Sequence, residues 1–120
     1  MLTMSRIIGS AIVLVAASLV IPPAEAGMME FHKTAKSGQP TLIGRLWSCK
    51  THVPPAGSQS GPQHGSVTLK DGQYNQCGNP NEPVKEVWYT SASGFKGEDS
   101  VQYLWGYRGV NGIMYHVAVQ

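Results

Sequence analysis

The chain has 120 residues and a formal net charge of +2, and only 13% of its residues are charged. Its basic residues are scattered and form no cluster or stripe, which argues against nucleic-acid binding. With 14 glycines and 8 prolines, the composition favours a loop-rich all-β domain over a helical one.

The first 26 residues have the pattern of a secretory signal peptide. Arg6 supplies a positive charge, residues 7–21 form an almost uninterrupted apolar run, and Pro22-Pro23 interrupts the helix before Ala24-Glu25-Ala26. An uncleaved membrane anchor is the alternative, but the run is shorter than the ~20 residues that a span usually needs. We therefore expect cleavage after Ala26 and a periplasmic or secreted protein with no later membrane span.

The rest of the chain is short for a self-sufficient hydrophobic core, so a covalent crosslink would stabilise it. It contains two cysteines, Cys49 and Cys77. An even cysteine count in an exported chain predicts a disulfide, worth roughly 3–4 kcal/mol in stability. A reactive thiol pair or a zinc site would be the alternative, but the spacing is far from that of Cys-x-x-Cys motifs.

The next part of the chain predicts one strand between two irregular segments. Residues 27–40 are polar and aperiodic, so we expect a flexible lead-in. Residues 41–49 predict a strand, whereas residues 52–63 are rich in proline, glycine and serine and predict no regular structure. Either of two pairs could face inward in the predicted strand: Leu42 and Leu46, or Ile43 and Trp47.

Later segments alternate between apolar and polar residues and predict strands at 66–70, 84–90, 99–105 and 113–120. Asp71-Gly72 is a tight-turn signal, and residues 74–83 predict a loop that carries Cys77. Short strands separated by turn signals are typical of a sandwich. We therefore expect five to seven short antiparallel strands over residues 41–120. The expected inward residues are Val67, Leu69, Val87, Tyr89, Val101, Tyr103, Trp105, Ile113, Tyr115, Val117 and Val119.

Two sequence motifs resemble the signature of bacterial immunoglobulin-like and cadherin-like β-sandwich modules. One begins at His64-Gly65 and the other runs from Gly94 to Tyr103. The resemblance implies a small immunoglobulin-like sandwich, which one disulfide would crosslink in this chain. The matching positions are His64, Gly65, Val67, Tyr89, Thr90, Gly94, Phe95, Gly97, Asp99 and Tyr103.

The residues of the second motif predict a structural corner. Gly94 and Gly97 permit backbone conformations that a Cβ would penalise, and Phe95 would close the end of the core. Asp99, just before a strand, can accept hydrogen bonds from loop amides, and the Tyr103 hydroxyl could join the same corner. A calcium site at Asp99 and its acidic neighbour is the alternative, but two acidic side chains are few for that ion.

Chemistry-bearing residues are sparse. His52, His64 and His116 have no pairing in sequence, and copper or zinc binding would require the fold to bring them together; otherwise they are unrelated turn and surface residues. Nothing resembles a nucleophile elbow or a catalytic acid pair. We therefore expect no enzymatic activity and no cofactor.

Two aromatic residues are candidates for binding. Trp88 is expected on the outward face of its strand and Tyr107 in the turn before the last strand, where either could anchor a partner. The alternative is that the tryptophans cover the ends of a small core. The sequence thus favours an exported, non-enzymatic binding or structural module of the bacterial envelope, with a protein or glycan as partner. A periplasmic copper- or zinc-binding protein and a small inhibitor of an envelope hydrolase are the alternatives.

Overall fold

The structure is a computed structural model that describes residues 28–55, 57–106 and 111–120. The predicted signal peptide therefore lies outside the described residues. Within them, no helix is long and apolar enough to cross a membrane. The strands are β1 (Met28–Ala35), β2 (Thr41–Leu46), β3 (Ser58–Ser60), β4 (Gly65–Gln76), β5 (Asn79–Ser91), β6 (Gly97–Trp105) and β7 (Asn111–Val119).

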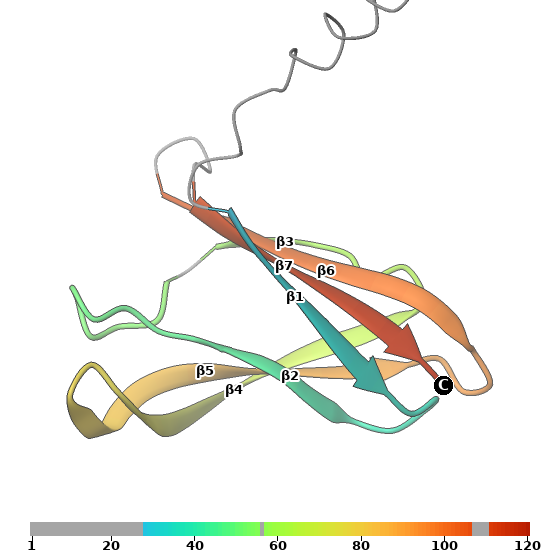
Figure 1. Cartoon of the computed structure of the whole chain (residues 1–120), viewed down its shortest axis with the longest axis horizontal. Coiled ribbons are helices and arrows are strands. Elements are labelled where there is room, and N and C mark those ends of the chain that lie inside the picture. The colour runs from blue at the N-terminus through green and yellow to red at the C-terminus, as the bar shows by residue number, and fades with distance from the viewer. Residues whose placement is uncertain (1–27, 56, 107–110) are drawn as a thin grey trace, which may run out of the picture.

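The strands form two layers, which confirms the predicted all-β sandwich (Figure 1). One sheet has the order β1-β7-β6-β3 and the other β2-β5-β4. Strands β7-β6-β3 and β2-β5-β4 correspond to the GFC and BED orders of an immunoglobulin sandwich. Within residues 41–120 every strand pair is antiparallel, as expected. The first strand, which lies before this range, joins the sheet of β7 through parallel pairing.

The core lies between the sheets, and the alternation in β6 and β7 predicts it correctly. Val101, Val117 and Tyr115 are among its fully buried side chains, and they face Val87 and Tyr89 of the other sheet. Leu69 is an exception. It was expected to face inward and its backbone pairs with Val87, yet its side chain is 43% exposed because β4 is the edge strand of its sheet.

The two competing faces of β2 are explained by a β-bulge. The register with β5 shifts between Leu42 and Gly44. An extra residue in one strand reverses the alternation beyond it, so Ile43 and Leu46 are both buried while Trp47 is exposed. Neither predicted pair was correct.

Two segments expected to be irregular contain strands. The predicted lead-in, 27–40, contains β1, whose residues pair with β7 along their whole length. The Pro/Gly/Ser-rich segment 52–63 contains β3, which pairs with β6. Both are edge strands, and the hydrogen bonds of an adjacent strand, rather than local propensity, hold them extended.

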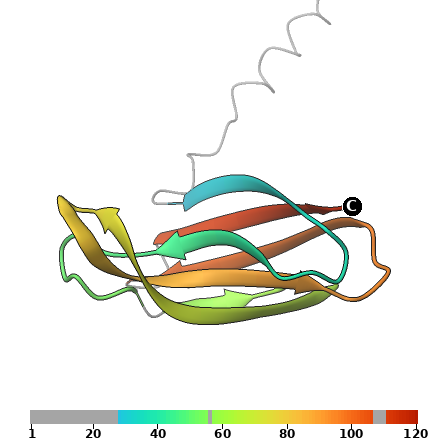
Figure 2. The same cartoon turned by 90° about the horizontal axis from the view of Figure 1, so that it is seen from below.

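The turn between β4 and β5 lies further along the chain than the sequence predicts. Strand β4 continues through Asp71-Gly72, and the predicted loop 74–83 is largely strand. The hairpin turns at Cys77-Gly78, where both residues have positive φ of 59° and 71°, as in a two-residue turn that matches strand twist. The resulting long hairpin curves at its tip (Figure 2).

The predicted disulfide joins Cys49, just after β2, to Cys77 in this hairpin turn. It therefore crosslinks two elements of the same sheet. Beside it, Glu82 and Val84 are fully buried outside the main core. The Glu82 carboxylate lies 3.0 Å from His52 Nδ1, so the segment after Cys49 covers this part of the sheet.

Candidate functional site

The corner motif is a closed hydrogen-bonded structure centred on Asp99, which is only 7% exposed. Its Oδ1 accepts from the amides of Gln63 and Ser100, both at 2.9 Å. Its Oδ2 accepts from the His64 amide at 3.0 Å and from the Tyr89 hydroxyl at 2.7 Å. The sequence predicted the amide contacts. Four protein donors occupy the carboxylate, which gives it a structural role.

These contacts also determine the ionisation of Asp99. Burial alone would raise the pKa of this carboxyl group. The hydrogen bonds from Gln63, Tyr89, Ser100 and His64 outweigh burial and lower the pKa below its ordinary value. Donors that favour the charged form are the physical cause. Asp99 is therefore a carboxylate at neutral pH.

The other motif residues shape the same corner. Gly94 and Gly97 have φ of +85° and +141°, values that L side chains rarely adopt. Phe95 packs against the core and stacks on His64, with ring centroids 4.1 Å apart. A Cβ at Gly65 would collide with the backbone of β5. Each residue thus has a structural explanation.

The tyrosine that binds Asp99 is not the one that we expected. Tyr89 of β5 makes this contact, whereas the Tyr103 hydroxyl donates to Gln59 Oε1 of β3 at 3.1 Å. Tyr103 follows Asp99 by four residues on the same strand face, so it lies further along β6, away from the corner. Tyr89 reaches Asp99 from the opposite sheet.

The three histidines proposed as metal ligands have separate contacts. His52 contacts Glu82, His64 stacks on Phe95, and His116 stacks on His32 at 4.7 Å while its Nε2 lies 2.7 Å from Glu30. Among the residues that the structure describes, no group of three or more His, Cys, Asp or Glu side chains is arranged to hold a metal ion. The geometry therefore does not favour copper or zinc binding.

Of the two candidate aromatic anchors, one can be located. Trp88 lies on the outward face of β5 as predicted, but it is half-buried. Its Nε1 donates to Glu86 at 3.0 Å and the Lys70 ammonium lies 4.9 Å from its ring centre. These contacts already occupy much of the indole. Tyr107 lies outside the described residues.

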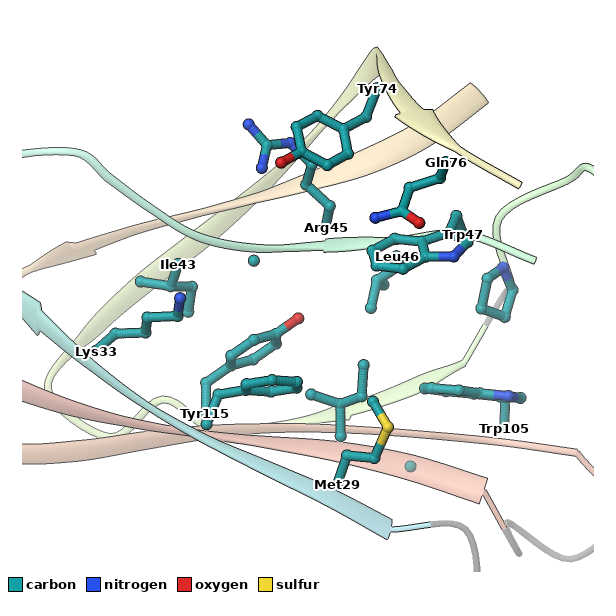
Figure 3. Close-up of a pocket in the computed structure, with 15 residues that line it drawn as sticks. Met29, Lys33, Ile43, Arg45, Leu46, Trp47, Tyr74, Gln76, Trp105 and Tyr115 are labelled. Carbon is teal, nitrogen blue, oxygen red and sulfur yellow. The ribbon is translucent and has the colours of Figure 1, made fainter. Parts of the chain in front are cut away.

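A cleft lies between the two sheets. It has a volume of about 400 Å³ and opens where the edge strands β1 and β2 are not bridged. Figure 3 shows Met29, Tyr115 and Trp105 on one side, and Ile43, Leu46 and Trp47 on the other. Its volume lies within the usual range of small-molecule sites.

The cleft leaves large apolar side chains in contact with solvent. Met29 is 51% exposed, Phe31 39% and Trp47 37%, although Met29 and Phe31 belong to the inward face of β1. Opposite them, the bulge in β2 places Gly44 against the Tyr115 hydroxyl, where a Cβ would collide with it. The cleft therefore exists because β1 extends one sheet beyond the other and Gly44 leaves room for Tyr115.

The sequence did not predict this cleft. Met29 and Phe31 fall in the segment expected to be a flexible lead-in, although their spacing with Ala35 follows the period of a strand. That alternation was the signal from which strand β1 could have been predicted. The opposing wall of the cleft depends on the bulge in β2, and the sequence indicated this bulge only through the two alternative inward faces of residues 41–49.

Comparisons with models of known protein families, with curated proteins and with solved structures found no match for this chain.

Proposed function

We propose that this protein is an exported, non-enzymatic binding module and that its ligand is an apolar small molecule held between the two sheets. The cleft carries the proposal: it is open, its walls are aromatic and aliphatic, and several of those side chains are exposed. Exposing such groups is unfavourable for a small domain unless a ligand covers them. A ligand that buried Met29, Phe31 and Trp47 would be stabilised by the hydrophobic effect.

Two further observations support the proposal that the protein is exported and that it is not an enzyme. The Cys49–Cys77 disulfide is typical of proteins in oxidising compartments, in agreement with the predicted signal peptide. The residues that line the cleft include no His, Cys, Asp, Glu, Ser or Thr. A nucleophile paired with a base, the usual basis of hydrolytic catalysis, is therefore not present in this wall.

The experiment uses the neutral dye Nile red, whose fluorescence rises in apolar surroundings. Met29→Glu places a carboxylate in the cleft, and Thr34→Glu places the same charge on the exposed outward face of β1. We expect the wild-type protein and Thr34→Glu to bind the dye alike. Met29→Glu should bind about tenfold more weakly, because the new carboxylate would lose hydration.

Equal dye binding by all three proteins would place the site elsewhere. No dye binding by the folded wild-type protein would refute an apolar ligand site. The proteins are compared by circular dichroism first, so that an effect on binding is separated from an effect on folding.

A further inference from the structure

The cleft is apolar, but its charged groups are all of one sign. Its lining contains two cationic residues, Lys33 and Arg45, and no Asp or Glu. In Figure 3, Lys33 reaches from β1 toward Ile43, between the sheets, whereas Arg45 points away from Tyr115 and toward Tyr74. The Arg45 guanidinium lies 3.9 Å from the Tyr74 ring centre. Lys33 is thus the charge directed into the cleft.

Lys33 is in a position to bind an anion. It occupies the inward face of β1, opposite the buried Val117. None of the ion pairs between described residues involves it. Lys33 is exposed, and with no carboxylate in the lining its ammonium can attract an anionic group at the mouth of the cleft.

A second donor lies beside Lys33. Tyr115 pairs with Phe31, two residues before Lys33 on the same face of β1, so the two side chains are diagonal neighbours. The Tyr115 side chain is only 2% exposed and its hydroxyl lies beside Gly44 in the wall of the cleft. No hydrogen bond joins this hydroxyl to another described residue, and Figure 3 shows it directed between the sheets. Burial, with a smaller effect from Tyr103, raises the pKa of Tyr115 to about 12. The hydroxyl therefore remains a donor at neutral pH.

The apolar groups continue from this polar end. Strand β1 advances about 3.3 Å per residue, so Lys33 and Met29 are separated by roughly 13 Å along the strand. Phe31 lies between them, and Trp47 and Trp105 line the far end of the cleft. The lining thus has a cationic, hydrogen-bonding end and an elongated apolar body.

We propose that the cleft binds a single-chain alkyl carboxylate. Its carboxylate accepts hydrogen bonds from the Lys33 ammonium and the Tyr115 hydroxyl, and its chain extends past Phe31 toward Trp47 and Trp105. The proposal rests on the proposed function, because it names the ligand class for the same cleft. Charge complementarity selects the carboxylate over a neutral or cationic amphiphile.

The test compares three ligands with the same ten-carbon chain: decanoate, decanol and decylammonium. Binding is measured near neutral pH by calorimetry and by tryptophan fluorescence, to which Trp47 and Trp105 of the cleft contribute, below the concentrations at which the ligands aggregate. We expect the wild-type protein to bind decanoate most tightly and decylammonium most weakly.

Two variants and one control identify the groups responsible. Lys33→Met should weaken decanoate binding about five- to tenfold, with decanol unchanged. Tyr115→Phe should weaken it about threefold by removing one donor. Lys96→Met makes the same change in net charge at an exposed corner residue and should leave all three affinities unchanged.

The outcomes separate the two proposals. If the wild-type protein binds none of the ligands and no Nile red, both proposals fail. If it binds all three alike, the binding function stands and the preference for a carboxylate is overturned. If decanoate is preferred but Lys33→Met and Lys96→Met behave alike, the assignment of the anion to Lys33 is overturned.

Discussion

The two ends of this sandwich are built in opposite ways. At the corner, Asp99 is buried and saturated with four donors, and Phe95 closes the core. At the cleft, Met29 and Phe31 are exposed and Lys33 forms no ion pair with a described residue. Satisfied polar groups and closed packing stabilise a fold, whereas open apolar surface and unpaired donors are what a ligand can use. The difference makes the corner a stabilising element and agrees with the proposal that the cleft binds a ligand.

The largest effect should come from Asp99→Ala. The substitution removes one acceptor for four donors and leaves buried amides and the Tyr89 hydroxyl without partners, so we expect a loss of about 4 kcal/mol in the free energy of unfolding. Urea denaturation measures it. The exposed neighbour is the control: Glu98→Ala should change stability by less than about 0.5 kcal/mol. Similar midpoints for the two variants would contradict a structural role for the corner.

Removal of the disulfide should have the next largest effect, and it acts on the hairpin next to the cleft. Its cysteines are 28 residues apart, and the chain-entropy relation for such a loop gives a loss of about 3.6 kcal/mol for the double variant Cys49→Ser/Cys77→Ser. Thermal denaturation in the presence and absence of reductant measures it. Reductant should destabilise the wild-type protein and leave the double variant unchanged. Two titratable thiols in the purified, denatured wild-type protein would show that the bond does not form.

One substitution, Tyr→Phe, compares the two ends directly. Tyr89→Phe should cost about 1–2 kcal/mol, because the hydroxyl donates to the buried Asp99 carboxylate. Tyr115→Phe should cost less than about 0.5 kcal/mol, because no hydrogen bond to a described residue is lost. Chemical denaturation of both variants under one set of conditions gives the comparison. An equal cost at both positions would remove the distinction between a saturated corner and an open cleft.

The smallest effect should be a loss of stability in acid. Because the pKa of Asp99 is lower in the folded protein than in the unfolded chain, its contribution is complete above the unfolded value, near 4. That contribution disappears as the pH falls through the folded-state pKa. Protonation removes the charge but keeps the acceptor oxygens, so the loss is smaller than that of Asp99→Ala. Stability measured from neutral to acid pH should fall less in Asp99→Asn than in the wild-type protein.

The parts of the fold that the sequence predicted are those in which alternation is local and uninterrupted. Residues 113–119 alternate without a break, and β7 lies between β1 and β6 in its sheet, so the prediction of its inward face was correct. The disulfide followed from the presence of only two cysteines. Asp99 was recognisable because it lies just before a strand, in a motif that resembles one of bacterial immunoglobulin-like modules.

The parts that the sequence did not predict depend on a neighbouring strand. Strands β1 and β3 are edge strands whose polar residues show little alternation, and pairing with β7 and β6 holds them extended. The bulge in β2 reverses its faces, and the turn at Cys77-Gly78 lies in a segment whose Asn, Gly and Pro content favoured a loop. In each case tertiary contact overrode local propensity.

The β class, the disulfide and the corner could be predicted because they depend on the period, count and type of residues that lie close together in the chain. The contact of Tyr89 rather than Tyr103 with Asp99, and the cleft that Met29, Phe31, Lys33 and Tyr115 share, became visible in the folded structure alone. These groups come from strands far apart in sequence. Their meeting depends on strand order, register and the separation between two sheets, none of which is encoded in the pattern of a single strand.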